Sequence, residues 1–222
     1  SAFRPDKAFY AEKQGFSDYI NCLSQAAQMD IFNFQSLMQA LEKRLEYFAE
    51  IGTMISDNGI EDFTWMDYSV QEIENIFVKA IGGKTLSQKE IAQYRSCFLM
   101  EMAQIYNRHH FVMQLHIGTY QGANKSRELH IGAACGFDCT DDSTRIKSIG
   151  ELLDRLTKMD ALPKTILYPL DARNIENYAV LAAGFCEAPI RAKVQLGAPW
   201  WFNDQRYGIK RQFEVVANLY PI

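Results

Sequence analysis

The spacing of apolar and polar positions predicts helices over much of the chain. Apolar side chains recur at helical intervals in residues 16–29 and again in residues 33–50, where Gly52 follows as a candidate C-terminal cap. Residues 69–83 and 87–110 each open with Ser-x-x-Glu, a pattern in which the two residues cap the first turn reciprocally. Similar spacing predicts later helices over residues 146–159, 173–186 and 206–219.

Short apolar runs separate these helices and are typical of buried strands. The first, residues 53–60, reads as a strand that breaks into a turn at Asp57, Asn58 and Gly59. Further strands are predicted over residues 111–118, 165–168 and 191–197. Strands that alternate with helices favour a parallel sheet covered by helices, as in a (β/α) barrel or a doubly wound sheet.

One connection between the predicted elements is unusually long. Residues 119–145 show no periodicity, and connections of more than about 15 residues are usually functional. Residues 198–205 are expected to form a shorter loop. The first ten residues are expected to be extended as far as Arg4, Pro5 and Asp6, because a residue before proline avoids the helical region.

Polar side chains stand where extended segments end: Arg4, Asp57, His116 and the cluster at residues 200–204. In both architectures, ligands bind beyond the carboxyl ends of the strands. An arginine grips a carboxylate with two hydrogen bonds, an aspartate accepts from hydroxyls, and a histidine moves a proton or holds a metal. Together these groups suit a small, anionic, hydroxylated ligand.

Each of these features also has a purely structural interpretation. Arg4 can pair with Asp6 at the surface, and an aspartate before Asn-Gly, as at Asp57, is ordinary turn chemistry. His116 can be a core histidine, and the tryptophans of the 200–204 cluster can be apolar plugs. The functional interpretation gains weight because all of them fall at the same end of successive strands.

Composition and charge narrow the class of protein. A net charge of −4 and an isoelectric point near 5.6 argue against nucleic-acid binding, which needs a basic patch. No apolar run approaches the ~18 residues of a membrane span, and the first residues lack the apolar core of a signal peptide. Five scattered cysteines are expected to be reduced thiols in a cytoplasmic protein, and Cys135 and Cys139 are interpreted as thiols rather than as a zinc site.

Six short motifs occur in order along essentially the whole chain: "FRPD", "SDNGI", "MQLHIG", "LPKTILY", "KVQLG" and "WWFNDQ". In this order they resemble the uronate isomerase (glucuronate isomerase) family of the amidohydrolase superfamily. The resemblance implies a (β/α)8 TIM-type barrel and a divalent metal cofactor, with zinc as the expected ion. It also implies a small hexuronate substrate, and the interconversion of D-glucuronate with D-fructuronate and of D-galacturonate with D-tagaturonate.

The resemblance also implies roles for five residues. Arg4 is similar to the family's arginine of the Arg-Pro-Asp motif, a substrate contact, and Asp57 to the acidic residue of a Ser-Asp-His-Gly turn. His116 is similar to the histidine that faces the metal and the substrate. We therefore expect His116 and Asp57 to be catalytic and His116 to be a metal ligand. Arg4, Trp201 and Asp204 are expected to join them in binding the substrate.

The chain departs from the family pattern in ways that bear on activity. Asn58 stands where the family has a histidine, and Gln121 replaces an arginine that binds substrate. The family's first-strand His-x-His pair and last-strand aspartate have no counterpart, so the remaining metal ligands are expected outside this chain. We expect an α/β fold: an incomplete barrel, from the end of strand three to helix seven, with extra helices. Residues 1–222 would form one such segment, with a helical insertion at about 61–110.

Three functions stay open at this point. The first is the central portion of an active uronate isomerase, inactive as an isolated chain. The second is a sugar-acid-binding homologue that has lost catalysis. The third is another metal-dependent hydrolase of the superfamily, although its expected lysine and histidine are missing from the ends of the strands predicted over 53–60 and 165–168. A homo-oligomer is compatible with each of them, and neither nucleic acid nor a membrane is expected as a partner.

Overall fold

The computed structural model describes residues 1–222 apart from 133–134, 142–145, 191, 199 and 221–222. The chain divides into two compact units. The first comprises Ser1–Asp57, Thr64–Met113 and Glu151–Pro163, and the second comprises Asn58–Phe63, Gln114–Gly150 and Lys164–Ile222. The first unit is largely helical, whereas the second holds a parallel sheet.

Capping side chains explain where the long helices of the first unit begin. Ser69 and Ser87 accept hydrogen bonds from the backbone N–H groups of Glu72 and Glu90, and each glutamate carboxylate accepts one in return. Asn33 and the residue three positions later cap another helix in the same way. The longer helices confirm the prediction to within one turn, whereas α1 replaces part of the extended segment expected at the start. The helices are α1 (Asp6–Phe9), α2 (Phe16–Ala27), α3 (Phe34–Glu50), α4 (Val70–Ile81) and α5 (Gln88–Arg108).

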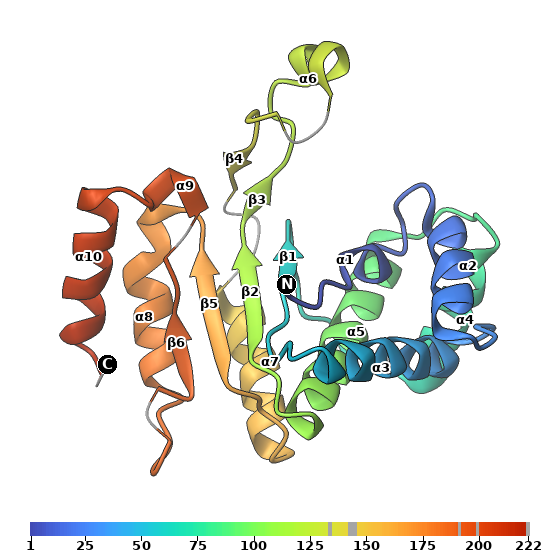
Figure 1. Ribbon diagram of the computed structural model, residues 1–222, viewed down its shortest axis with the longest axis horizontal. Coiled ribbons are helices and arrows are strands. Elements are labelled where there is room, and N and C mark those ends of the chain that lie inside the picture. The colour runs from blue at the N-terminus through green and yellow to red at the C-terminus, as the bar shows by residue number, and fades with distance from the viewer. Residues whose placement is uncertain (133–134, 142–145, 191, 199, 221–222) are drawn as a thin grey trace. The chain divides into compact units, whose positions relative to one another are not determined.

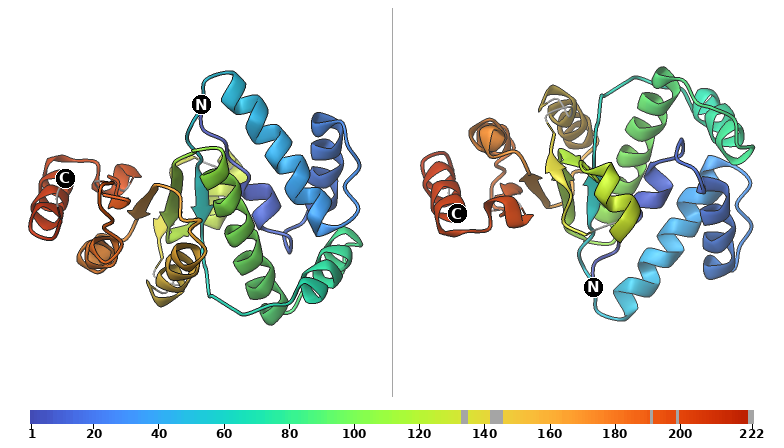
Figure 2. Two further views of the ribbon diagram at one scale, coloured as in Figure 1. Left: turned by 90° about the horizontal axis from the view of Figure 1, so that it is seen from below. Right: turned by 90° about the horizontal axis from the view of Figure 1, so that it is seen from above.

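The core of the first unit is built around α5. Tyr94 and Phe98 on this helix are both 1% exposed, and the Tyr94 ring meets Phe16 and Phe34 edge-on at centroid distances of 6.3 and 5.6 Å. The buried Tyr94 hydroxyl donates to the carbonyl of Ala8 at 2.9 Å, so it keeps a hydrogen-bond partner. Figure 2 shows α2, α3 and α4 gathered with α5 around this core.

Three extended segments of the first unit run parallel to one another. Phe3 pairs with Ser56, and Ile55 pairs with Val112, through isolated parallel bridges. The Phe3 N–H donates to the Ile55 carbonyl at 3.0 Å, and the Val112 N–H donates to the Met54 carbonyl at 2.9 Å. The prediction of a buried strand is wrong for part of this segment, because Met54 and Ile55 are 43% and 42% exposed.

The sheet of the second unit keeps its strands in chain order (Figure 1). Its strands are β1 (Asn58–Ile60), β2 (Met113–Ile117), β5 (Thr165–Pro169) and β6 (Val194–Leu196), in the order β1-β2-β5-β6. The pairs β1–β2 and β5–β6 are parallel. A doubly wound sheet reverses its strand order at a switch point, whereas a barrel does not. The predicted α/β class with a parallel sheet is confirmed, and the strand order favours the barrel type.

Strand β1 occupies the place where a turn was expected, so that prediction is wrong. Asn58 and Gly59 pair in register with Leu115 and His116 of β2. The Asn58 side-chain amide also donates to the backbone carbonyl of Gln114 at 2.9 Å. Pairing with a strand far along the chain therefore outweighs the local turn preference of Asn-Gly.

Helices cover the sheet of the second unit, and α8 packs against β5 and β6 while α10 packs against α8 (Figure 1). The helices predicted before β5 and after β5 and β6 are confirmed. The prediction of a loop over residues 198–205 is wrong, because α9 forms there. Among the described residues, none of the helices is both long and apolar enough to cross a membrane. The helices from Ile146 onward are α7 (Ile146–Lys158), which belongs to the first unit from Glu151 onward, the 3-10 helix η1 (Ala172–Asn174), α8 (Ile175–Ala183), α9 (Trp200–Asn203) and α10 (Arg206–Ala217).

The long connection after β2 is more regular than its sequence indicates. It contains β3 (Thr119–Tyr120), α6 (Lys125–Ile131) and β4 (Cys139–Thr140), and β3 pairs with β4 antiparallel. Gly118 opens the connection with φ of +86°, and a Cβ added there would lie 2.3 Å from the Asp141 carbonyl oxygen. The glycine is therefore required for the chain to turn from β2 into β3.

Candidate functional site

Arg4 and Asp57 lie together in the first unit because Phe3 and Ser56, the residues before them, pair directly. The Arg4 Nη1 donates to Asp57 Oδ2 at 2.9 Å, and its Nε donates to Asp6 Oδ2 at 2.7 Å. The surface pair with Asp6, considered as a structural role for Arg4, is thus present beside the contact with Asp57. Two predicted site residues, Arg4 and Asp57, are in direct contact.

The Arg4 guanidinium forms ion pairs with two carboxylates, those of Asp6 and Asp57. Partial burial acts to lower the pKa of Arg4, but the charges of Asp6 and Asp57 outweigh it and raise that pKa. The Arg4 side chain is 48% exposed, whereas those of Asp6 and Asp57 are 21% and 22% exposed. The guanidinium can therefore bind a ligand carboxylate from the solvent side by exchanging one of its partners.

His116 lies near the end of β2 in the second unit, in a cluster of three side chains. Burial alternates along β2, so Gln114 and His116 share one face. The half-buried His116 ring stacks on Tyr168 of β5, with centroids 4.4 Å apart and planes 11° from parallel. The Tyr168 hydroxyl donates to Gln114 Oε1 at 2.5 Å. The imidazole is thus held beside an aromatic ring that is itself tied back to β2.

Tyr168 is the member of this cluster that the sequence patterns did not single out as a site residue. One feature of the sequence could have indicated Tyr168 as a site residue: like His116, it lies near the carboxyl end of a predicted strand. The absence of a side chain at Gly197 leaves room for the Tyr168 ring, because a Cβ added there would lie 2.1 Å from Tyr168 Cε1. Gly197, directly after β6, donates its N–H to the Leu167 carbonyl at 2.9 Å.

The two positions that depart from the family pattern have different surroundings. Asn58 is 5% exposed and bonds through its amide to the Gln114 carbonyl, so it helps to join β1 to β2. Gln121 is exposed in the turn after β3. A histidine at position 58 would remove this amide donor from the Gln114 carbonyl.

The last predicted site residues, Trp201 and Asp204, belong to the "WWFNDQ" motif. Trp201 lies in α9, and its side chain falls outside the part of the chain that the structure describes. Asp204 follows α9 and is exposed. The side-chain amide of Asn203 donates to the Leu170 carbonyl at 3.2 Å, which ties α9 to the residue after β5.

The described residues do not complete a metal site. Outside the undescribed positions, no group of three or more His, Cys, Asp or Glu side chains is placed to hold an ion. The described neighbours of His116 in its cluster, Tyr168 and Gln114, are not the imidazole, thiolate or carboxylate ligands that zinc favours. These residues alone therefore do not fit the metal that the resemblance implies.

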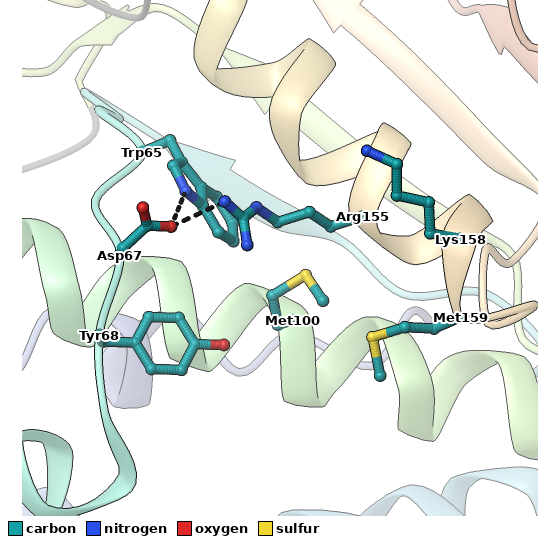
Figure 3. Close-up of a pocket in the computed structure, with 7 residues that line it drawn as sticks. All are labelled: Trp65, Asp67, Tyr68, Met100, Arg155, Lys158 and Met159. Atoms are coloured by element: carbon teal, nitrogen blue, oxygen red, sulfur yellow. Dashed lines mark hydrogen bonds and ion pairs between the residues drawn. The ribbon is translucent and has the colours of Figure 1, made fainter.

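A cavity of about 400 Å³ in the first unit is lined by none of the predicted site residues (Figure 3). Arg155 lies over the Trp65 ring at 4.7 Å and donates to Asp67 at 2.7 Å, and Lys158 pairs with Asp154 at 2.5 Å. Both of its cations, like Arg4, already contact carboxylates. The lining residues are Trp65, Asp67, Tyr68, Met100, Arg155, Lys158 and Met159.

Comparison with known sequences gives one consistent match. A protein-family model described as glucuronate isomerase matches residues 1–220. The uronate isomerase of Clostridium perfringens is 38% identical over 218 residues, which cover 98% of this chain and 47% of that protein. The uronate isomerase of Photorhabdus laumondii is 39% identical over 219 residues, which cover 98% and 46%. The chain spans about half the length of the curated relatives it matches.

Solved structures give the same match for the fold. The structure is similar to uronate isomerase from Thermotoga maritima, with a TM-score of 0.87 and 27% identity over 99% of this chain and 47% of that one. Glucuronate isomerase from Caulobacter crescentus gives 0.85 and 26%, over 98% and 44%. The predicted fold, an incomplete barrel of the (β/α)8 type, is confirmed. With the family model matched along nearly all of its length, the chain belongs to the glucuronate isomerase family.

Proposed function

We propose that this chain forms part of a uronate isomerase that interconverts D-glucuronate with D-fructuronate and D-galacturonate with D-tagaturonate. The observation that carries the proposal is the family match over residues 1–220. The polar residues at the strand ends agree with it, because they offer a cation, a carboxylate and an imidazole to a hydroxylated acid. The reaction is an intramolecular oxidoreduction in which the aldehyde at C1 becomes an alcohol and the alcohol at C2 becomes a ketone.

The proposed reaction needs one proton to be moved between neighbouring carbons. A base removes the proton from C2 while O1 gains a proton, which gives the enediol. A proton then returns at C1 while O2 loses its own, which leaves the carbonyl at C2. His116 is the candidate to carry this proton, since histidine exchanges protons near neutral pH. Asp57 is the candidate to accept hydrogen bonds from substrate hydroxyls during the transfer.

The remaining residues are proposed to hold the substrate. Arg4 would bind the uronate carboxylate through two parallel hydrogen bonds, in place of one of its present carboxylate partners. Trp201 and Asp204 would contact the sugar from α9 and the residue after it. Zinc, with His116 as one ligand, stays a prediction from the resemblance. It is the alternative to the proton-carrying role, because a ring nitrogen that ligates a metal cannot also accept a proton, and the other ligands would come from outside this chain.

A sugar-acid-binding homologue without turnover is the second candidate, and two residues favour it. Asn58 is a buried structural residue where the family has a histidine, and Gln121 is exposed where the family has an arginine. Replacing a guanidinium by an amide removes the charge that would balance the substrate carboxylate. Uronate binding without ketose formation would identify this case.

The test is proton NMR of D-glucuronate and D-galacturonate in D₂O, with and without zinc. This chain is compared with the product of its complete open reading frame. We expect the complete product to exchange the C2 proton and form ketose, and this chain alone to do neither. His116→Gln should lower the rate by about 10²–10⁴-fold, whereas His130→Gln, at an exposed position of α6, should not. Failure of the complete product to convert either sugar would overturn the proposal.

We also propose a cellular location, a partner and a domain organisation for this protein. A cytoplasmic location agrees with cysteines that form no disulfide in the described part of the chain. A small hexuronate is the proposed partner, and a homo-oligomer remains compatible with it. Residues 1–222 are proposed to be one barrel segment, with the helical insertion at about 61–110.

A further inference from the structure

We propose that Tyr168 is a positioning residue, whose ring fixes the plane of the His116 imidazole. The catalytic part of this inference rests on the proposed function. The structural part does not, because it follows from contacts inside the second unit. Nothing in the motif pattern of the sequence assigns a role to Tyr168.

The first observation is how completely the Tyr168 ring is constrained. Its hydroxyl donates to Gln114 Oε1 at 2.5 Å, and Gln114 lies two residues before His116 on the same face of β2. One face of the ring stacks on the imidazole at a centroid distance of 4.4 Å. The ring atoms Cε1, Cζ and Cδ1 lie where a side chain at Gly197 would begin, at 2.1–2.6 Å from its Cβ position.

The second observation is that these positions form one row across the sheet. Gly59 of β1 is the register partner of His116, and Gly197 follows directly after β6, beside the Tyr168 ring. Two rings are therefore flanked by two positions without side chains. The two glycines leave room for the two rings on this face of the sheet, where the imidazole lies beside the Tyr168 ring.

The chemical consequence concerns rotation of the imidazole. The torsion between Cβ and an aromatic ring is broad, so an isolated histidine ring samples many planes. A stack with planes 11° apart selects one of them and leaves the ring nitrogens only two orientations, which are related by a half-turn of the ring. Proton transfer needs the base within hydrogen-bond reach of the proton it removes, so a freely turning imidazole is a poorer catalyst.

The inference is tested with three variants of the complete product. Tyr168→Leu removes the stacked ring, and Tyr168→Phe keeps the ring but removes the bond to Gln114. Gly197→Ala keeps both rings but displaces the Tyr168 ring from its present position, because its Cβ would overlap that ring. Tyr207→Leu is the matched control, since Tyr207 on α10 is 73% exposed. Circular dichroism establishes that each variant is folded.

The first readout is the chemical shift of the His116 ring protons, which a stacked aromatic ring displaces. The resonance is identified by its loss in His116→Gln. We expect it to move in Tyr168→Leu and Gly197→Ala, to stay nearly unchanged in Tyr168→Phe, and to be unaffected in Tyr207→Leu. An unchanged resonance in folded Tyr168→Leu would overturn the inference whether or not the protein is an isomerase.

The second readout is steady-state kinetics on D-glucuronate. We expect kcat to fall by about 10–100-fold in Tyr168→Leu and Gly197→Ala, with KM changed much less, and Tyr168→Phe to restore most of the rate. A moved resonance with full kcat would overturn the catalytic part of the inference. If the wild-type product has no activity, the proposed function fails, while the chemical shifts still decide whether Tyr168 positions His116.

Discussion

At the scale of single residues, side chains find partners that their neighbours in the sequence do not reveal. Arg4 was expected beside Asp6 and also bonds to Asp57, 53 residues away. Asn58 was expected in a turn and instead bonds to the carbonyl of Gln114, 56 residues away. The residue types at a site could therefore be predicted, but their contacts could not, because strand pairing decides them.

Asn58 provides a test of one such contact. Asn58→Asp keeps the shape of the side chain but replaces the amide donor to the Gln114 carbonyl with an acceptor. Because that carbonyl would face a second acceptor at a 5% exposed position, we expect a loss of about 1–3 kcal/mol in the free energy of unfolding. Urea unfolding measures it. The matched change Asn75→Asp, on an exposed face of α4, should have little effect, and equal losses would contradict the assigned role.

Cys97 provides a second test at this scale. The thiol is 6% exposed, and burial, reinforced by the charge of Glu101, raises its pKa to about 12. A raised pKa means that little reactive thiolate is present at pH 8, so Cys97 should be alkylated far more slowly than the exposed Cys22. Timed iodoacetamide labelling with mass spectrometry gives the two rates. Similar rates in the folded chain would show that α5 opens readily.

At the scale of elements, helices could be predicted better than strands. The beginnings of α4 and α5 followed from Ser-x-x-Glu, because a capping box is contained in four consecutive residues. β1 could not be predicted, because its short sequence carries turn residues and is extended through pairing with β2. The two rings of the second unit differ in the same way. His116 could be recognised because it is a polar residue in an apolar run, whereas a tyrosine such as Tyr168 is common in strands, and only its stack on His116 distinguishes it.

The two capping boxes predict a pH dependence of stability. Hydrogen bonds from Gln93 and Ser69 lower the pKa of Glu72 from 4.5 to about 2, and the bond from Lys79 is the main cause that lowers that of Glu90 to about 2. Since both values are lower in the folded state, these carboxylates stabilise it above about pH 4.5. That contribution is lost as the pH falls from about 4.5 towards 2.

The pH dependence is measured by urea unfolding between pH 6 and pH 2. The double variant of Glu72→Gln and Glu90→Gln keeps the hydrogen-bonding shape of each box but removes its charge. We expect it to lose less stability than the wild type as the pH falls. Glu46→Gln, at an exposed position of α3, is the control and should follow the wild type. Parallel curves for the double variant and the wild type would contradict the prediction.

At the scale of the whole molecule, the described sheet has two outer strands. In the strand order, β1 pairs with β2 and β6 pairs with β5, so each of the outer strands has one neighbour in the described part of the chain. Outer strands expose backbone groups that can pair with another chain. The chain spans about half the length of its curated relatives, which agrees with a sheet that needs further strands to close.

The edge at β6 predicts association of the isolated chain. Gln195 is exposed on this strand, and a charge there should oppose edge-to-edge pairing. We expect the wild-type chain to form larger species as its concentration rises, and Gln195→Lys to form fewer of them, as measured by light scattering. Gln71→Lys, at an exposed position of α4, adds the same charge elsewhere. Equal behaviour of the two variants would show that net charge, not the strand edge, controls association.

The Tyr168 ring occupies the space that a side chain at position 197 would need, and this has a consequence for how the family can diverge. A side chain at position 197 would begin 2.1 Å from an atom of that ring, so the two positions cannot accept substitutions independently. A lineage that gains a side chain at 197 must first, or at the same time, replace the tyrosine with something smaller. Relatives should therefore lack one combination, a side chain at 197 together with a tyrosine at 168. Wherever the tyrosine has been exchanged, the histidine would have to be held by other means, so this pair of positions marks where branches of the family would differ in how that ring is supported.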